Sequence, residues 1–183
     1  MKKIGIVTDS HSSISQEEAK KLGIFVLPMP FYIDGECYYE SVTLSRELFF
    51  EKLTSGADIS TSQPSPTAVM EIWDKALEEY EKILYMPISS GLSSSYNTAM
   101  MLAQEEKYEG RVLVVDDGQV AAPLHQMILD TLDMIEKGYE AEQIRDLLER
   151  AGDRMMIYIA LQTLEFLKKG GRVTPAAAAL GSV

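Results

Sequence analysis

Cysteine, long apolar runs and basic residues are all scarce in this sequence, and each scarcity excludes a class of protein. The lone cysteine, Cys37, cannot form an intrachain disulfide. No apolar run approaches the roughly 18 residues that a membrane-spanning helix needs, so we expect no membrane span. Residues 1–7 lack the apolar stretch and cleavage site of a signal peptide and open directly into a strand pattern. We therefore expect a cytoplasmic protein.

The charge balance excludes a further class of partner. Seventeen Lys and Arg stand against 28 Asp and Glu, a net charge of −11 that repels nucleic acid and anionic membrane surfaces. The glycine patterns of the Rossmann and Walker nucleotide sites are absent as well. These absences predict a protein with no nucleic-acid partner and no cofactor.

What the sequence does have is a globular composition with alternating elements. Its 183 residues and 46% hydrophobic content suit one well-buried domain. Short apolar runs predict strands, and apolar residues at helical spacing predict the helices between them. The predicted strands cover 3–8, 83–88, 111–115 and 155–160, with a short extended piece at 24–28 and a hairpin at 29–40. The predicted helices cover 16–22, 45–53, 66–80, 93–105, 120–137, 141–151 and an Ala-rich stretch at 176–180. This order predicts an α/β fold with a mostly parallel sheet flanked by helices on both sides.

Four polar turns lie between the predicted elements. They are Asp9–Ser10, Thr61–Ser62, Ser89–Ser95 and Asp116–Asp117. In such sheets ligands lie off the carboxyl ends of the strands, where we expect all of these turns. A strand-to-helix turn offers unpaired N–H groups and the positive end of the helix dipole, which favour an anion such as a carboxylate or phosphate. Helix capping by Ser, Thr and Asp is an equally good account of these turns.

A serine hydrolase is disfavoured. Gly91–Ser95 resembles a nucleophile elbow, but Ser95 occupies the position where that pattern requires glycine. The only histidine that follows, His125, sits inside a predicted helix, where a packed or surface role is the simpler interpretation. The serines therefore look like hydrogen-bond donors.

The acidic turns also give little support for a metal. His11 lies beside Asp9, where it orients a ligand or faces water, and Asp116–Asp117 has no further acidic or histidine partner at useful spacing. We expect no metal site.

The order of four motifs resembles the DegV family of bacterial proteins. The matching stretches are Val7–Ser10, Thr61–Ser65, Ser89–Asn97 and Leu164–Val173. The resemblance covers almost the whole chain, and it implies the DegV-like N-terminal lobe as the fold. It also implies binding of a long-chain fatty acid, with the acyl chain buried between two lobes.

By the same resemblance, the carboxylate is held by Thr61, Ser62, Ser93 and Asn97, with Ser94 as a lesser candidate. Family members also serve as the lipid-presenting subunit of a fatty acid kinase. The resemblance therefore implies a carrier and not an enzyme.

Two departures from the family pattern stand out. The family's Asp-Ser turn after the third parallel strand is here Asp116–Gln119, which puts a ligand contact from that turn in doubt. Family members also continue into a further lobe that supplies a histidine near the carboxylate, whereas this sequence stops at Val183. We expect residues 1–183 to form one lipid-binding domain that is incomplete at its C-terminus, with the second lobe missing or only begun. A natural short paralogue, an early stop codon and a shortened fragment all remain open.

The alternative function is an interaction or self-associating module that has lost lipid binding. A missing lobe leaves apolar surface open, and open apolar surface favours self-association. A phosphate-ester enzyme ranks last, because the sequence offers it no base or metal.

Overall fold

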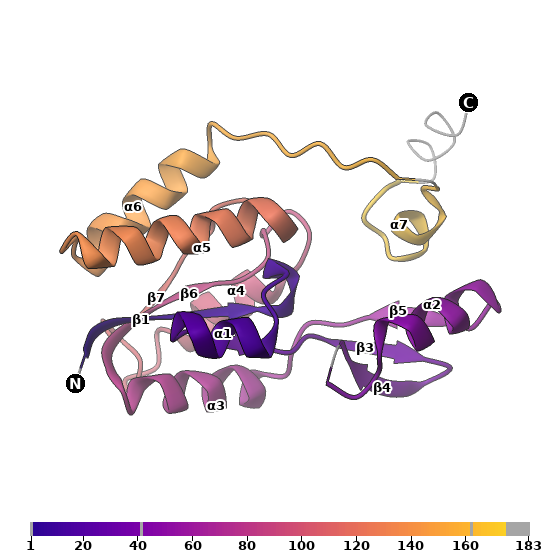
Figure 1. Ribbon diagram of the computed structural model, residues 1–183, viewed down its shortest axis with the longest axis horizontal. Helices are drawn as coiled ribbons and strands as arrows, with labels where there is room; N and C mark the ends of the chain where they lie inside the picture. The colour runs from indigo at the N-terminus through magenta and orange to yellow at the C-terminus, as the bar shows by residue number, and fades with distance from the viewer. Residues whose placement is uncertain (1, 41, 162, 175–183) are drawn as a thin grey trace.

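The computed structural model describes residues 2–40, 42–161 and 163–174 (Figure 1). A four-stranded sheet has the order β2-β1-β6-β7, with every neighbouring pair parallel, and a smaller antiparallel sheet has the order β4-β3-β5. The strands are β1 (Lys2–Asp9), β2 (Phe25–Leu27), β3 (Pro30–Ile33), β4 (Glu36–Tyr39), β5 (Ile59–Thr61), β6 (Tyr80–Met86) and β7 (Val112–Val114). The helices are η1 (Ser10–Ser12), α1 (Gln16–Leu22), α2 (Arg46–Thr54), α3 (Pro66–Leu77), α4 (Ser95–Leu102), α5 (Ala121–Glu136), α6 (Ala141–Gly152) and α7 (Glu165–Lys169). The predicted α/β class with a parallel sheet is confirmed.

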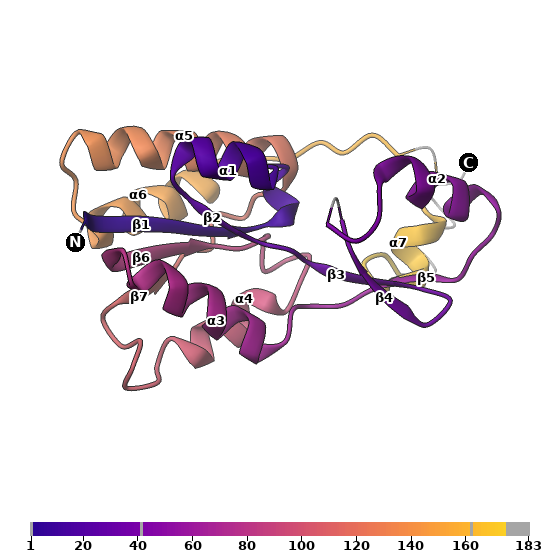
Figure 2. The same cartoon turned by 60° about the horizontal axis from the view of Figure 1, so that its bottom comes forward.

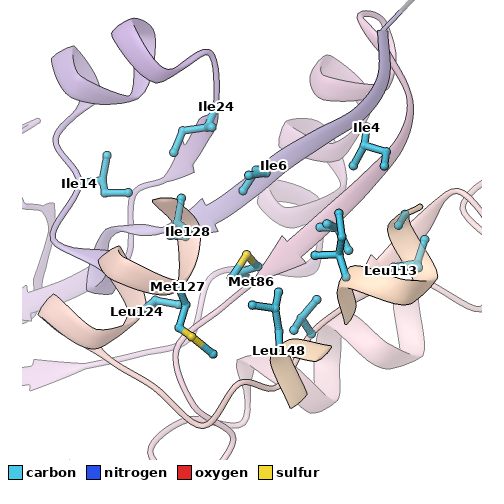
Figure 3. Packing of buried hydrophobic residues seen from close by; sticks show 14 of the residues in the cluster. Ile4, Ile6, Ile14, Ile24, Met86, Leu113, Leu124, Met127, Ile128 and Leu148 are labelled. Carbon is cyan, nitrogen blue, oxygen red and sulfur yellow. The ribbon is translucent and has the colours of Figure 1, made fainter. Parts of the chain in front are cut away.

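Helices cover both faces of the parallel sheet. On one face, side chains of α1, α5 and α6 pack against alternate residues of the strands, with Ile6, Met86, Ile128 and Leu148 among them (Figure 3). Successive strand residues point to opposite faces, so the residues between these face the other layer. This packing holds the carboxyl ends of β1, β6 and β7 along one edge.

The opposite face is covered by α3 and α4 around a buried aromatic cluster. The Trp73 ring lies edge-on to Tyr85 at 5.3 Å and to Tyr108 at 5.2 Å between ring centroids. The Tyr108 hydroxyl donates to Asp74 at 3.0 Å. Edge-on aromatic pairs add to the stability that comes from burial alone. The cluster anchors α3, the helix that begins just after the Thr61–Ser62 turn.

Local sequence accounts for the helix starts. Ser15, Ser45 and Ser65 each lie at an N-cap, and each hydroxyl accepts a hydrogen bond from the N–H three residues on. Pro66 occupies the first turn of α3, where its missing N–H costs nothing. The predicted starts of these helices are confirmed.

The smaller sheet lies beside the parallel one, with α2 and α7 next to it (Figure 2). Its hairpin turns at Asp34 and Gly35, whose φ angles of 51° and 84° are the left-handed values that a two-residue hairpin turn requires. Phe31 on β3 packs edge-on against Phe49 on α2 at 5.4 Å between centroids. This sheet and α2 form a second layer next to the edge that carries the polar turns.

Two predictions about elements are wrong. Residues 155–160 form no strand, because strand-forming side chains need a neighbouring strand and none lies beside this segment in the described chain. The Thr61–Ser62 turn follows β5 of the antiparallel sheet and not a strand of the parallel sheet, because β5 pairs with β3. The predicted helix at 176–180 lies outside the described residues. Within the part of the chain that the structure describes, no helix is long and apolar enough to cross a membrane.

Candidate ligand-binding site

The first polar turn is built around a buried carboxylate. Asp9 ends β1 and is fully buried. Its Oδ2 accepts the N–H of Ile88 at 2.9 Å and its Oδ1 accepts the N–H of His11 at 2.9 Å. The His11 ring Nδ1 lies 3.2 Å from the same Oδ1. Asp9 therefore ties the end of β1 to the segment that follows β6.

The hydroxyls of the first turn also serve the fold. Ser10 Oγ accepts the N–H of Met29 at 3.1 Å, which fixes the chain between β2 and β3. Ser12 Oγ donates to the Asp9 carbonyl at 2.8 Å. These bonds position the turn and leave Ser10 at the wall of a cavity.

The second turn opens on that cavity. Thr61 and Ser62 are both exposed and both line it. The N–H of Ser62 donates to the Pro30 carbonyl at 3.4 Å, which holds the turn against β3. Ser62 Oγ donates to the Gln63 carbonyl at 3.1 Å, whereas the Thr61 hydroxyl makes no hydrogen bond within the described chain.

The cavity has a volume of about 520 Å³ and lies between the first turn, the start of α1, the smaller sheet and α2. Its size falls in the range of about 300–1,000 Å³ that is usual for ligand sites. The apolar part of its wall comprises Ile14, Val26, Pro28, Met29, Pro30, Phe31, Leu44, Phe49, Phe50 and Ile59. The polar part comprises Ser10, His11, Ser13, Ser15, Gln16, Glu40, Ser45, Arg46, Thr61 and Ser62. A wall that combines apolar side chains with polar ones suits a ligand that has an apolar body and a polar end.

The third turn leads into α4. Ser93 Oγ accepts the N–H of Ser95 at 3.2 Å. Ser94 lies at the N-cap of α4, yet its side chain makes no capping hydrogen bond. Asn97 is exposed in the first turn of the helix, and its side chain has no hydrogen-bond partner among the residues that the structure describes. Helix capping therefore leaves Ser94 and Asn97 unexplained.

The structure brings the second and third turns close together. Thr98 Oγ1 on α4 donates to Gln63 Oε1 at 3.1 Å, and this bond joins the two segments. The candidate residues are nevertheless divided: Thr61 and Ser62 line the cavity, whereas Ser93, Ser94 and Asn97 stand outside its lining.

The C-terminal motif reaches the same region. Arg172 Nε donates to the Leu92 carbonyl of the third turn at 3.3 Å. Lys169 on α7 pairs with Asp58, which precedes β5. Three of the four motifs thus meet near the smaller sheet.

The fourth turn contacts the third in a way that the sequence did not reveal. Asp116 Oδ1 accepts the N–H of Ser90 at 3.3 Å, and the Gln119 carbonyl accepts the N–H of Ser89 at 2.9 Å. Asp117 is buried beside them, and burial raises the pKa of its carboxyl to about 7. No local signal in the sequence separates this buried aspartate from its half-buried neighbour Asp116.

The two histidines have structural contacts. His125 Nε2 on α5 lies 3.1 Å from Glu18 Oε1 on α1, so it joins two helices of one layer, and His11 contacts Asp9. Among residues 2–40, 42–161 and 163–174, no group of three or more His, Cys, Asp or Glu side chains is arranged to hold a metal ion.

Comparisons with known proteins cover almost the whole chain. A DegV domain-containing protein from Deinococcus radiodurans is 35% identical over 181 residues, which make up 98% of this chain and 64% of that protein. A DegV family protein from Thermus thermophilus, whose structure is described as showing fatty acid binding, matches with a TM-score of 0.87 at 34% identity and covers 98% of this chain and 64% of its own. A stearic-acid-binding protein from Eubacterium ventriosum matches with a TM-score of 0.82 at 25% identity, over 100% of this chain and 64% of its own.

The chain thus spans about 64% of the length of each of these relatives. The family model described as "Uncharacterised protein, DegV family" matches residues 3–183. With the order of its motifs and the parallel sheet that carries them, this chain belongs to the DegV family.

Proposed function

We propose that this chain binds a long-chain fatty acid and holds its carboxylate with Thr61, Ser62, Ser93, Ser94 and Asn97. The observation that carries the proposal is the cavity of about 520 Å³, whose wall combines apolar side chains with hydroxyls that include those of Thr61 and Ser62. A fatty acid has this division into a long apolar chain and one charged end.

The free hydrogen-bonding groups support a carboxylate. A carboxylate that leaves water needs donors to replace it, and each charge-assisted hydrogen bond contributes about 1.5–3 kcal/mol. Within the described part of the chain, the side chains of Thr61, Ser94 and Asn97 make no hydrogen bond. Ser15 and Ser65, in contrast, are committed to capping. The unbonded groups are therefore available to donate to a ligand.

The apolar wall suits the acyl chain. Phe31, Phe49 and Ile59 present hydrocarbon surface from β3, α2 and β5. Each methylene that leaves water contributes about 0.8 kcal/mol. Affinity should therefore rise with chain length until the cavity is filled.

The relatives support the same ligand class. The structures from Thermus thermophilus and Eubacterium ventriosum are described as fatty-acid-binding and stearic-acid-binding, at 34% and 25% identity to this chain. We extend the proposal to a cytoplasmic carrier that performs no catalysis and presents its fatty acid to a fatty acid kinase.

Titration of the chain with palmitate tests the proposal, with Thr61→Ala and Ser93→Ala as variants. Loss of one donor to the carboxylate should weaken binding by roughly 10- to 150-fold, which corresponds to about 1.5–3 kcal/mol. Ser60→Ala is the matched control, because Ser60 neighbours Thr61 on β5 but does not line the cavity. Unchanged affinity in both variants would contradict the proposal and would mean that the polar turns serve only to cap helices.

A self-associating module is the second candidate, and one observation favours it. Met156, Tyr158 and Ile159 are 75%, 87% and 58% exposed in the segment between α6 and α7. Exposed apolar side chains in a row can pair with a second copy of the chain. Sedimentation at rising concentration tests this: a dimer that Tyr158→Ser disrupts supports it, and a monomer at every concentration contradicts it.

A further inference from the structure

The buried turn behind the third motif contains acceptors without donors. Asp117 is 1% exposed and Gln119 is 1% exposed. Asp117 Oδ1 accepts the N–H of Gln119 at 2.9 Å, and Gln119 Nε2 donates to the Asp117 carbonyl at 2.9 Å. Asp117 Oδ2 and Gln119 Oε1 are both buried, and neither has a partner in the described residues. A buried unsatisfied acceptor is costly, so this turn lacks one donor.

Helix α6 packs closely on the backbone of this turn. A Cβ atom added to Gly152 at the end of α6 would lie 2.2 Å from the Asp117 carbonyl oxygen, so α6 presses directly on this turn. The simplest donor is a proton on Asp117 itself, because it converts one of its oxygens from acceptor to donor.

The surrounding charges favour that proton. Burial raises the pKa of Asp117 most, and the charges of Asp116 in the same turn and of Asp9 at the end of β1 raise it further. Glu149 on α6 is near Asp116, and its own pKa is also raised, chiefly by burial. His11 contacts Asp9, and Arg145 on α6 acts against the raised pKa of Glu149. The local field is therefore negative and opposes a second carboxylate charge.

The turn is coupled to the third motif through two hydrogen bonds. The Gln119 carbonyl accepts the N–H of Ser89, and the Asp116 carboxylate accepts the N–H of Ser90. Ser89 and Ser90 start the segment that leads to Ser93. An ionised Asp117 can reach water only if this turn moves, and such a movement breaks the bonds that hold Ser89 and Ser90.

We propose that protonated Asp117 is a latch that holds the third motif in its ligand-binding position, and that its ionisation releases the motif and weakens fatty acid binding. The proposal rests on the proposed function for its ligand. Asp117 acts as a positioning residue, since it holds the turn that holds Ser89.

The latch predicts a specific pH dependence. If only the protonated form binds, the apparent dissociation constant rises with the ionised fraction, by about 2-fold at pH 7 and about 11-fold at pH 8 for a pKa of about 7. Asp117→Asn removes this titration, because an amide keeps the shape and supplies a permanent donor. Asp153→Asn, at an exposed residue after α6, is the matched control.

Palmitate affinity is measured for wild type and both variants at pH 6, 7 and 8. Ionisation of palmitate changes its measured affinity equally for all variants at one pH, so this effect cancels when the variants are compared. The latch predicts that wild type and Asp153→Asn weaken relative to Asp117→Asn by about 11-fold at pH 8, with near-equal affinities at pH 6. Parallel pH profiles would overturn the latch and leave fatty acid binding intact.

A ligand-free measurement separates failure of the latch from failure of the proposed function. Carbon-13 NMR of the wild-type Asp117 carboxyl should give a pKa near 7. Above that pH the amides of Ser89 and Ser90 should lose protection from hydrogen exchange. A carboxyl that titrates near its ordinary value of 3.8 overturns the latch whether or not palmitate binds. Absence of palmitate binding in every variant, with the expected titration, overturns the proposed function alone.

Discussion

Replacement of Asp117 by asparagine should stabilise the fold at neutral and alkaline pH. The wild-type side chain is 1% exposed, and its Oδ2 has no partner in the described chain. Burial raises the pKa of this carboxyl from 3.8 to about 7. Between these values the folded protein holds a proton that the unfolded protein releases. Stability from this group is therefore greatest below pH 3.8 and is lost as the pH rises through about 7.

The size of the effect follows from the shift. About three pKa units at 1.36 kcal/mol each give roughly 4 kcal/mol over the full range. Between pH 5 and pH 8 the loss from Asp117 is roughly 2–3 kcal/mol, because part of it has already occurred below pH 5. Asparagine does not titrate, so the variant should not show this part of the pH dependence.

Urea unfolding at pH 5, 6, 7 and 8 measures the difference. All other titrating groups are shared, so their contributions cancel when wild type is subtracted from Asp117→Asn. The free energy difference should grow in favour of the variant by roughly 2–3 kcal/mol across this range. A difference that stays constant with pH would refute the reasoning, since it would mean that Asp117 has an ordinary pKa in the folded protein.

Two further predictions concern packing. Gly152→Ala should destabilise the protein by about 1–3 kcal/mol, because its new methyl group would overlap the Asp117 carbonyl, which as backbone cannot rotate away; an unchanged urea midpoint would contradict this. Ile128→Ala, on the buried face of α5, should lower the free energy of unfolding by about 2–5 kcal/mol. Leu147→Ala, at a 42% exposed position on α6, should lower it much less, and thermal unfolding measures both. Equal losses of stability in the two variants would contradict the described burial of Ile128.

Features that depend on neighbours in sequence could be predicted. Ser65 and Pro66 predict the start of α3, because an N-cap and a first-turn proline affect only the few residues next to them. The Asp34–Gly35 turn likewise sets the hairpin locally. The alternation of apolar runs with amphipathic stretches was enough to predict the parallel sheet and its helices.

Features that depend on residues far away in the sequence could not be predicted. Residues 155–160 have the composition of a strand, but a strand exists only beside another strand. Thr61 joins the smaller sheet because it pairs with Phe31 on β3, 30 residues earlier, and no pattern near Thr61 encodes that choice. Asp117 is buried because Gly152 allows α6 to approach it. The latch is therefore visible only in the folded chain.

The candidate site was predicted in part. The turns after β1, β6 and β7 lie at the carboxyl ends of the parallel strands as expected, since strand direction follows from the order of elements. The cavity wall from α2 and the smaller sheet was not foreseen, because Phe31 and Phe49 come together only when the hairpin packs on α2. The assignment of Thr61, Ser62, Ser93, Ser94 and Asn97 to a carboxylate stays a prediction.

Native mass spectrometry of the purified chain with palmitate tests the central claim most directly. The account predicts a complex of one fatty acid per chain. The complex should be weakened in Thr61→Ala and retained in Ser60→Ala, because Thr61 lines the cavity and Ser60 does not. A chain that binds no palmitate at pH 6, or that binds it equally well in Thr61→Ala, would contradict the account.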